Sequence, residues 1–152
     1  MTQSHPAAAR PEQTPWMMAC LTVRDVPAAK DFYARAFGFE AGMAVQDEYG
    51  NVLHGEIRWK DTAFMLGPED GDCRAPVSTG HRPPASLYFY TEDVDATFRR
   101  ALEAGAAVSL NVMNAPWGDR LGQVIDPVGH LWTIATHIAE PDMAAAGYTV
   151  VE

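Results

Sequence analysis

Apolar and polar positions in the first half of the chain change from a strand-like to a helix-like period and back. Residues 16–23 form a short apolar run with β-branched members, which predicts a strand. Apolar residues then recur at helical spacing from Val26 to Phe37, and Gly38 is expected to end this helix. Beyond it the strand-like period returns, and we expect three strands, at 39–46, 51–59 and 62–66.

The second half of the chain repeats this order. A strand at 85–91 precedes a helix that begins after Asp93 and ends at Gly105, matching Asp25 and Gly38 of the first half. The chain is therefore predicted to hold two tandem βαβββ units that form curved mixed sheets, an α+β fold. A doubly wound fold is disfavoured because helices do not alternate with every strand. The last three strands are expected at 106–112, 121–125 and 131–137.

The repeat also predicts how the chain is divided. The first residues are polar, rich in Pro and Ala and without periodicity, so we expect a disordered tail. The stretch between the units is rich in Gly, Pro and polar residues, which indicates a loop. We expect a tail, a first unit, a linker loop, a second unit and a C-terminal extension, at 1–15, 16–67, 68–84, 85–138 and 139–152.

Three stretches carry a resemblance to a known family. They read LTVRDVPAAKDFYARAFGFE in the first unit, then YTEDVDATFRRALEAGA and WGDRLGQVIDPVGHLWTIATH in the second. With the repeat, they make the chain resemble the vicinal oxygen chelate superfamily of glyoxalase I, bleomycin-resistance proteins and extradiol dioxygenases. The resemblance covers residues 16–137. It implies a cup of curved sheet from each unit, a ligand site inside the cup, and a homodimer.

In metal-dependent members of that superfamily, the first and last strands of each unit supply one metal ligand apiece. Carried over one by one, those positions fall on Met18, Met65, Ser86 and Thr133. Two thioethers and two hydroxyls do not suit a hard or borderline divalent ion. The resemblance therefore points to the metal-less, glyoxalase-like branch, and we expect no metal and no cofactor.

Strand alternation names the side chains that are expected to line the cup. Tyr88 and Tyr90 are in step with Ser86, and Trp117 precedes a turn where its ring can overhang the cup. Such a lining suits a flat, largely apolar ligand. The alternative is that these rings are core, which we favour for Tyr88 and for Trp132, while Tyr90 and Trp117 are expected to contact the ligand. The remaining members of the set are Trp16, Cys20, Thr22, Leu131, Ala135 and His137.

Histidines are the candidates for acid–base chemistry. His137 is in phase with the cup and is the best of them. His54 and Glu56 share one face of a strand, where they form either a displaced metal or acid–base pair or an ordinary solvated face. His130 follows a glycine turn and is expected to bind backbone carbonyls. For Arg120 we expect an ion pair that stabilises a turn, with anion binding as the alternative.

Composition and charge exclude several classes of function. The chain has 11 Lys and Arg against 20 Asp and Glu, and the formal charge of -9 without a basic run argues against nucleic-acid binding. No stretch approaches roughly 18 uninterrupted apolar residues, and the first residues lack the apolar region of a signal peptide. Two cysteines, Cys20 and Cys73, do not make a disulfide framework. We expect a cytoplasmic protein whose acidic residues serve solubility and are almost absent from the cup.

Three functions remain open on these grounds. The first is a metal-free, homodimeric protein that sequesters or carries a small, partly aromatic ligand in the sheet cup. The second is a glyoxalase-like lyase or isomerase, or a dioxygenase-type enzyme, that uses a displaced metal site around His54, Glu56 and His137 or an acid–base pair. The third is a subunit whose cup is filled by its own side chains.

Overall fold

The computed structural model describes residues 9–152. Its first unit comprises β1 (Cys20–Val23), α1 (Val26–Phe37), β2 (Glu40–Gln46), β3 (Val52–Trp59) and β4 (Thr62–Pro68). The strands form a mixed sheet in the order β1-β4-β3-β2, in which β1 and β4 are parallel and the other neighbours are antiparallel. This is the order that a βαβββ unit requires, because α1 carries the chain across the sheet from β1 to β2.

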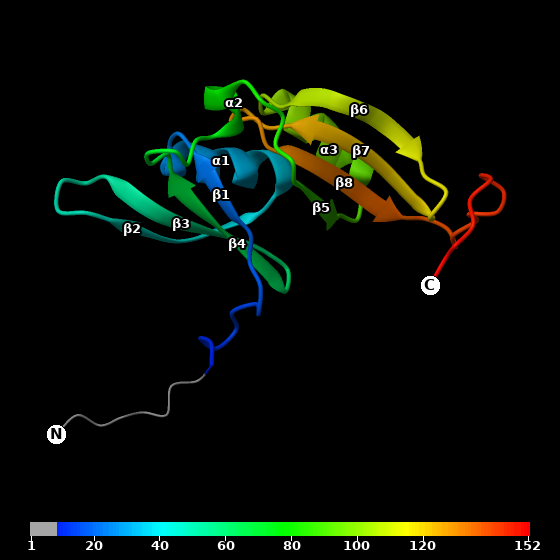
Figure 1. The fold of residues 1–152 in the computed structure, drawn as a ribbon, viewed down its shortest axis with the longest axis horizontal. Helices are drawn as coiled ribbons and strands as arrows, with labels where there is room; N and C mark the ends of the chain where they lie inside the picture. Colours follow the sequence, from blue (N-terminus) through cyan, green and yellow to red (C-terminus); the bar gives the residue numbers. More distant parts are fainter. Residues whose placement is uncertain (1–8) are drawn as a thin grey trace.

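The second unit repeats the first strand by strand (Figure 1). Its elements are β5 (Ser86–Tyr90), α3 (Val94–Glu103), β6 (Ala107–Asn114), β7 (Asp119–Ile125) and β8 (Leu131–His137). The sheet order is β5-β8-β7-β6, again with only the first pair parallel. The predicted α+β fold of two tandem βαβββ units is confirmed.

Several bounds differ from the prediction, and β7 begins at Asp119 rather than at residue 121. The first strand begins at Cys20 rather than at residue 16, so residues 16–19 lie outside it. The linker contains a one-turn helix, α2 (Pro76–Thr79), which packs on the second unit through a hydrogen bond from Val77 N to Val128 O of 2.9 Å. Of the expected tail, residues 1–8 lie outside the described residues, and residues 9–15 form turns and bends without helix or strand.

Matching aspartates begin the two long helices. The side chain of Asp25 accepts a hydrogen bond of 2.8 Å from Ala28 N, and that of Asp93 accepts one of 2.9 Å from Ala96 N. A carboxylate in this position satisfies a backbone N–H that the helix itself cannot. Gly38 ends α1 in the left-handed conformation, with φ of 74°. The repeat that is visible in the sequence is thus a repeat of helix starts as well as of strands.

The two helices pack together, and the helix-side faces of both sheets merge into one core. Phe39 and Phe89, from different units, have ring centroids 4.9 Å apart. At the centre, the carboxylate of Asp126 accepts hydrogen bonds from Tyr33 Oη at 2.6 Å and Trp132 Nε1 at 2.9 Å. Trp132 is buried, as expected. The other face of each sheet points away from α1 and α3, and we call it the cup face.

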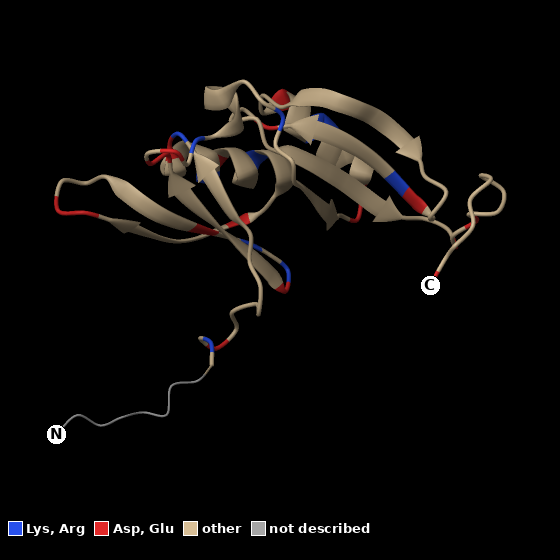
Figure 2. Ribbon diagram, viewed as in Figure 1, with Lys and Arg blue, Asp and Glu red and all other residues tan. Residues whose placement is uncertain are grey.

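Most acidic residues lie on loops, turns and helix starts, including the β2–β3 turn and the loop that follows β4 (Figure 2). Asp119 is an exception, since it lies at the start of β7 with its side chain on a cup face and only 1% of its surface exposed.

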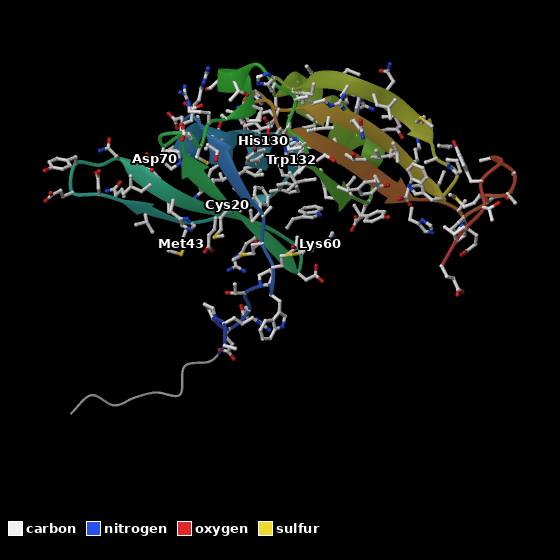
Figure 3. All side chains as sticks on the ribbon, in the orientation of Figure 1. Cys20, Met43, Lys60, Asp70, His130 and Trp132 are labelled. Carbon is white, nitrogen blue, oxygen red and sulfur yellow. The ribbon has the colours of Figure 1, made fainter. Side chains whose placement is uncertain are left out.

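Within residues 9–152 no helix combines the length and the hydropathy that a membrane crossing needs. His130 Nε2 lies 2.8 Å from Thr22 O and ties the two units together, in keeping with a structural role (Figure 3).

Candidate functional site

Three side chains converge on the carboxylate of Asp119, on the cup face of the second unit. The hydroxyl groups of Tyr88 and Tyr90 donate to Oδ2 at 2.6 and 2.8 Å. Nδ1 of His137 lies 2.8 Å from Oδ1. Trp117 extends the group, because its Nε1 donates to the Tyr88 hydroxyl at 3.2 Å. We call these five residues the Asp119 cluster.

Sheet topology brings the cluster together. Strand β8 lies between β5 and β7, so side chains on the cup face of all three strands are neighbours. Asp119 is paired with His137 across the β7–β8 ladder. Tyr88 and Tyr90 are two residues apart on β5 and therefore share a face, with ring centroids 5.6 Å apart. The alternate residues of β5, Leu87 and Phe89, face the core.

A tight turn delivers Trp117 and Asp119 to the cluster. Gly118 lies between them with φ of 94°, a left-handed conformation that side chains other than glycine rarely adopt. A Cβ atom at this position would collide with the backbone oxygen of Ala139. Glycine is therefore required here both for the turn and for the close approach of the chain that follows β8.

Asp119 is a buried, ionised carboxylate. Burial opposes its ionisation, but the hydrogen bonds from Tyr88, His137 and Tyr90 outweigh burial, so the pKa of Asp119 lies below its ordinary value. The same contacts act in the opposite direction on the phenols. Burial and the hydrogen bond to Asp119 raise the pKa of Tyr88 to about 12. The pKa of Tyr90 is also raised, chiefly by its hydrogen bond to Asp119.

His137 presents one ring nitrogen to the outside. Its Nδ1 is bound to Asp119, while the side chain is 53% exposed. Within the described part of the chain, no group is hydrogen-bonded to Nε2. An imidazole that is oriented by a buried carboxylate and open at its second nitrogen has the arrangement of a general acid or base.

The rings of the cluster are not core. Tyr88, for which we favoured a core position, is 45% exposed, and Tyr90 and Trp117 are exposed to a similar degree. That expectation was wrong because β5 is an edge strand, and no helix or strand within residues 9–152 covers its cup face. Thr133 is buried beside them and accepts a hydrogen bond from Gln123 Nε2 at 3.1 Å. Ser86 is exposed at the start of β5.

The other expected site residues lie on the sheet of the first unit. Cys20 is paired with Met65 across the β1–β4 ladder, just as Tyr88 is paired with Thr133 across β5–β8. Met18 precedes β1 and is half-buried. The strand partners of Met65 and Thr133 therefore lie two residues later in the sequence than Met18 and Ser86, which were expected in these places.

His54 Nε2 and Glu56 Oε1 lie 3.9 Å apart, and Glu56 Oε2 also lies 3.7 Å from the guanidinium group of Arg58. The start of β3 and the end of β8 lie towards opposite ends of the molecule (Figure 1). A single-chain site that combines His54, Glu56 and His137 is therefore not formed. No group of three or more His, Cys, Asp or Glu side chains suited to a metal ion occurs in residues 9–152.

Asp119 is the residue of the cluster that sequence reasoning missed. The ion pair expected for Arg120 is formed with Asp95 of α3, at 2.8 Å, so Arg120 does not occupy the Asp119 carboxylate. The available signal was the phase of the strand: Asp119 is the only acidic residue in step with Leu121 and Gln123 along β7.

The sequence profile of the Glyoxalase/Bleomycin resistance protein/Dioxygenase superfamily matches residues 15–134. The chain belongs to this superfamily. The match spans the first βαβββ unit and the second as far as Ile134 of β8, and it includes the strands that carry Tyr88, Tyr90 and Asp119. Membership establishes the fold and leaves the ligand and the reaction open.

Similar proteins agree with this assignment. Uncharacterised proteins of Mycobacterium bovis and Mycobacterium tuberculosis are 35% identical over 128 residues, which cover 81% of this chain and 84% and 75% of theirs. The crystal structure of TioX from Micromonospora sp. ML1 is similar with a TM-score of 0.64 and 28% identity, over 80% of this chain and 98% of that one. FosX of Listeria monocytogenes, a fosfomycin resistance protein, has a TM-score of 0.60 at 14% identity, over 81% and 93%, and shares the fold.

Proposed function

We propose that this protein binds a small, partly aromatic molecule on the cup face of the second unit, without a metal ion. The observation that carries the proposal is the Asp119 cluster, in which one buried carboxylate holds two tyrosines and a histidine in place. Rings that are positioned before the ligand arrives lose little conformational entropy on binding. Exposed rings without a structural task would not need such an anchor.

The chemistry of the surface defines the class of ligand. Tyr88, Tyr90 and Trp117 offer ring surfaces, on which a flat molecule stacks favourably. His137 Nε2 provides one polar contact beside them. At the strand positions that hold the metal in metal-dependent members of the superfamily, this chain has thioether, thiol and hydroxyl side chains. Such side chains are poor ligands for a hard cation. We infer a planar ligand that carries one hydrogen-bonding group and is bound with this group next to His137.

A second copy of the chain is proposed to close the cup. Leu110 and Met113 of β6 are exposed and pair with Gln123 and Leu121, which places them on the cup face. Val45 is exposed in the same way on the first sheet. Apolar side chains on both open faces favour a homodimer. The two cysteines are free and exposed, which suits the reducing cytoplasm that we propose as the protein's location.

Dimer formation is tested by light scattering on the purified protein. The wild type is expected at twice the monomer mass, and Leu110→Glu at the monomer mass. Val150→Glu is the control, because Val150 is also an exposed apolar residue but lies in the C-terminal extension. A wild-type monomer, or a dimer that Leu110→Glu leaves intact, would contradict this part of the proposal.

Ligand binding is tested with acridine, a planar molecule of three fused rings with one hydrogen-bonding ring nitrogen. We expect acridine to bind the wild type, and Tyr90→Ala to weaken binding by about three- to tenfold, the contribution of one aromatic contact. Tyr49→Ala is the matched control, since Tyr49 is an exposed tyrosine of the β2–β3 turn. Equal affinity for all three proteins would reject the Asp119 cluster as the site.

A second candidate function is acid–base catalysis, favoured by the orientation of His137. Asp119 holds Nδ1 and leaves Nε2 free to take a proton from a bound molecule and return it at another position, as in an isomerase or lyase. The test uses a compound that binds and has an acidic C–H bond. In deuterated water, NMR is expected to show faster C–H exchange with the wild type than with His137→Gln. Equal exchange rates would leave binding as the function.

A further inference from the structure

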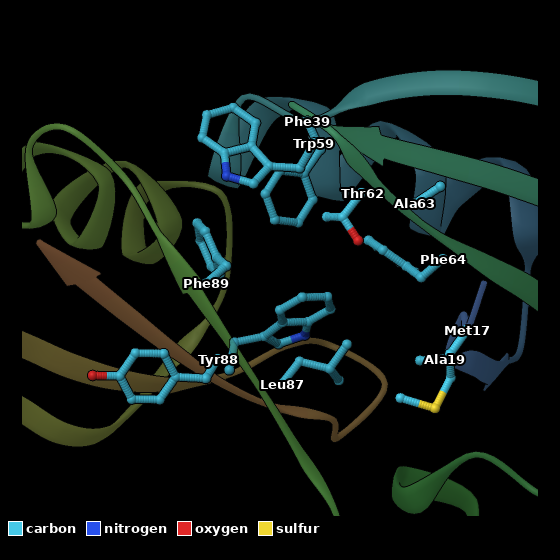
Figure 4. Close-up of a pocket in the computed structure, with 11 residues that line it drawn as sticks. Met17, Ala19, Phe39, Trp59, Thr62, Ala63, Phe64, Leu87, Tyr88 and Phe89 are labelled. Atoms are coloured by element: carbon cyan, nitrogen blue, oxygen red, sulfur yellow. The ribbon is translucent and has the colours of Figure 1, made fainter. Parts of the chain in front are cut away.

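A cavity of about 210 Å³ lies between the two units, on the core side of the sheets (Figure 4). Rings from both units surround it, with Phe39, Trp59 and Phe64 from the first unit and Phe89 and Trp132 from the second. Met17 and Ala19, which precede β1, line it as well, and both are exposed. The cavity is therefore accessible from the side where the chain enters β1.

Strand β5 separates this cavity from the Asp119 cluster. Leu87 and Phe89 point into the cavity. Tyr88 contributes to the cavity wall, but Figure 4 shows its ring directed away from the other lining side chains, and its hydroxyl donates to Asp119 on the cup face. The cavity and the cup therefore lie on opposite faces of one strand and form separate sites.

Both indole N–H groups of the cavity wall are already hydrogen-bonded. Trp59 Nε1 donates to Tyr90 O at 2.9 Å, and Trp132 Nε1 donates to Asp126 at 2.9 Å. Among the described residues no charged side chain lines the cavity, and the hydroxyl-bearing lining residues are Thr62 and Tyr88, whose hydroxyl donates to Asp119. A charged ligand would lose its hydration here without a partner, so the chemistry selects an uncharged, apolar ring.

We propose that this cavity is a second binding site, for one uncharged aromatic compound of one or two rings. An apolar cavity of about 150 Å³ is enough to bind benzene. The space between Trp59, Phe89 and Phe64 is larger and offers ring edges and faces to a guest. Binding there does not depend on the function proposed for the Asp119 cluster.

Indole and bromobenzene are the probes for this site. Crystals soaked with bromobenzene are expected to show anomalous bromine density between Trp59 and Phe89. In solution, Ala19→Phe is expected to weaken indole binding at least tenfold, because a ring at this exposed mouth position fills the entrance. Ala44→Phe is the matched control, since it adds the same ring to an exposed alanine of β2 outside the cavity.

Several results would overturn the proposal. One is bromine density that appears only on the cup face. Another is a crystal structure in which Trp16 or a side chain of a second copy fills the cavity. The third is an affinity for indole that is the same in Ala19→Phe as in the wild type. The proposals for the two sites can be rejected independently of each other. Tyr90→Ala tests the cup, because Tyr90 does not line the cavity, and Ala19→Phe tests the cavity, because Ala19 is not part of the Asp119 cluster.

Discussion

Asp119 and His137 face each other across the β7–β8 ladder, with Oδ1 and Nδ1 2.8 Å apart. The carboxylate is almost completely buried, whereas half of the imidazole is exposed. Asp119 is thereby shielded behind the groups that it holds, so the rings and not the charge are exposed on the cup face. The relationship makes Asp119 a positioning residue for the proposed site.

Replacing Asp119 by Asn is expected to destabilise the protein by about 1–3 kcal/mol. The amide is uncharged, and its NH₂ group cannot accept the hydrogen bonds that one carboxylate oxygen now accepts. Urea denaturation measures the change. Asp95→Asn is the matched control, because Asp95 is half-exposed in its ion pair with Arg120 and is expected to cost no more than about 1 kcal/mol. Equal losses would contradict the central role of Asp119.

Tyr88 is expected to ionise at higher pH than an ordinary tyrosine, with a pKa of about 12 instead of 10.0. Since the folded state holds this proton more tightly than the unfolded state, the associated stability is complete below pH 10 and is lost as the pH rises towards 12. The phenolate absorbance of the wild type minus that of Tyr88→Phe measures the titration. In Asp119→Asn the value is expected to return towards 10.0. An unchanged value there would assign the shift to burial alone.

Acid destabilisation is expected to depend in part on Asp119. Its pKa is lower in the folded state, so its contribution is present above the unfolded value of 3.8 and is lost as the pH falls through the folded pKa. Melting temperatures of the wild type and Asp119→Asn are compared from neutral pH downwards. The gap between them is expected to narrow below pH 3.8. A constant gap would show that the charge of Asp119 does not stabilise the fold.

Gly118→Ala is expected to destabilise the protein by about 1–3 kcal/mol and to weaken acridine binding. The added Cβ meets the backbone oxygen of Ala139, and the left-handed φ strains any other residue. Gly67→Ala is the matched control, because a Cβ at Gly67 meets nothing within 4 Å and its φ is not left-handed. Thermal unfolding compares the two variants. Similar melting temperatures would contradict the requirement for glycine at position 118.

The helices and most strands were predictable because their signals are local. Asp25 and Asp93 begin helices by binding N–H groups three residues ahead, and Gly38 ends a helix within its own turn. Strand ends were less predictable. β1 starts at Cys20 because pairing with β4 begins there. The sequence of residues 16–19 contains no signal for where this pairing begins.

The candidate site was predictable only in part. Phase along β5 and β8 placed Tyr88, Tyr90, Thr133 and His137 on one face, because alternation is a property of each strand alone. Whether a ring on that face is core or surface depends on what covers the sheet. The exposure of Tyr88 was therefore mispredicted, since no element of the second unit packs over the cup face.

The sequence by itself determined the two units, their helix limits and the face of each strand that carries aromatic side chains, because these follow from spacing over a few residues. Only the tertiary structure decided that Asp119 is the centre of the site. Its partners are 31, 29 and 18 residues away along the chain. Such contacts arise when β8 inserts between β5 and β7, and the order of strands in a sheet is set by packing of the whole chain rather than by any local pattern.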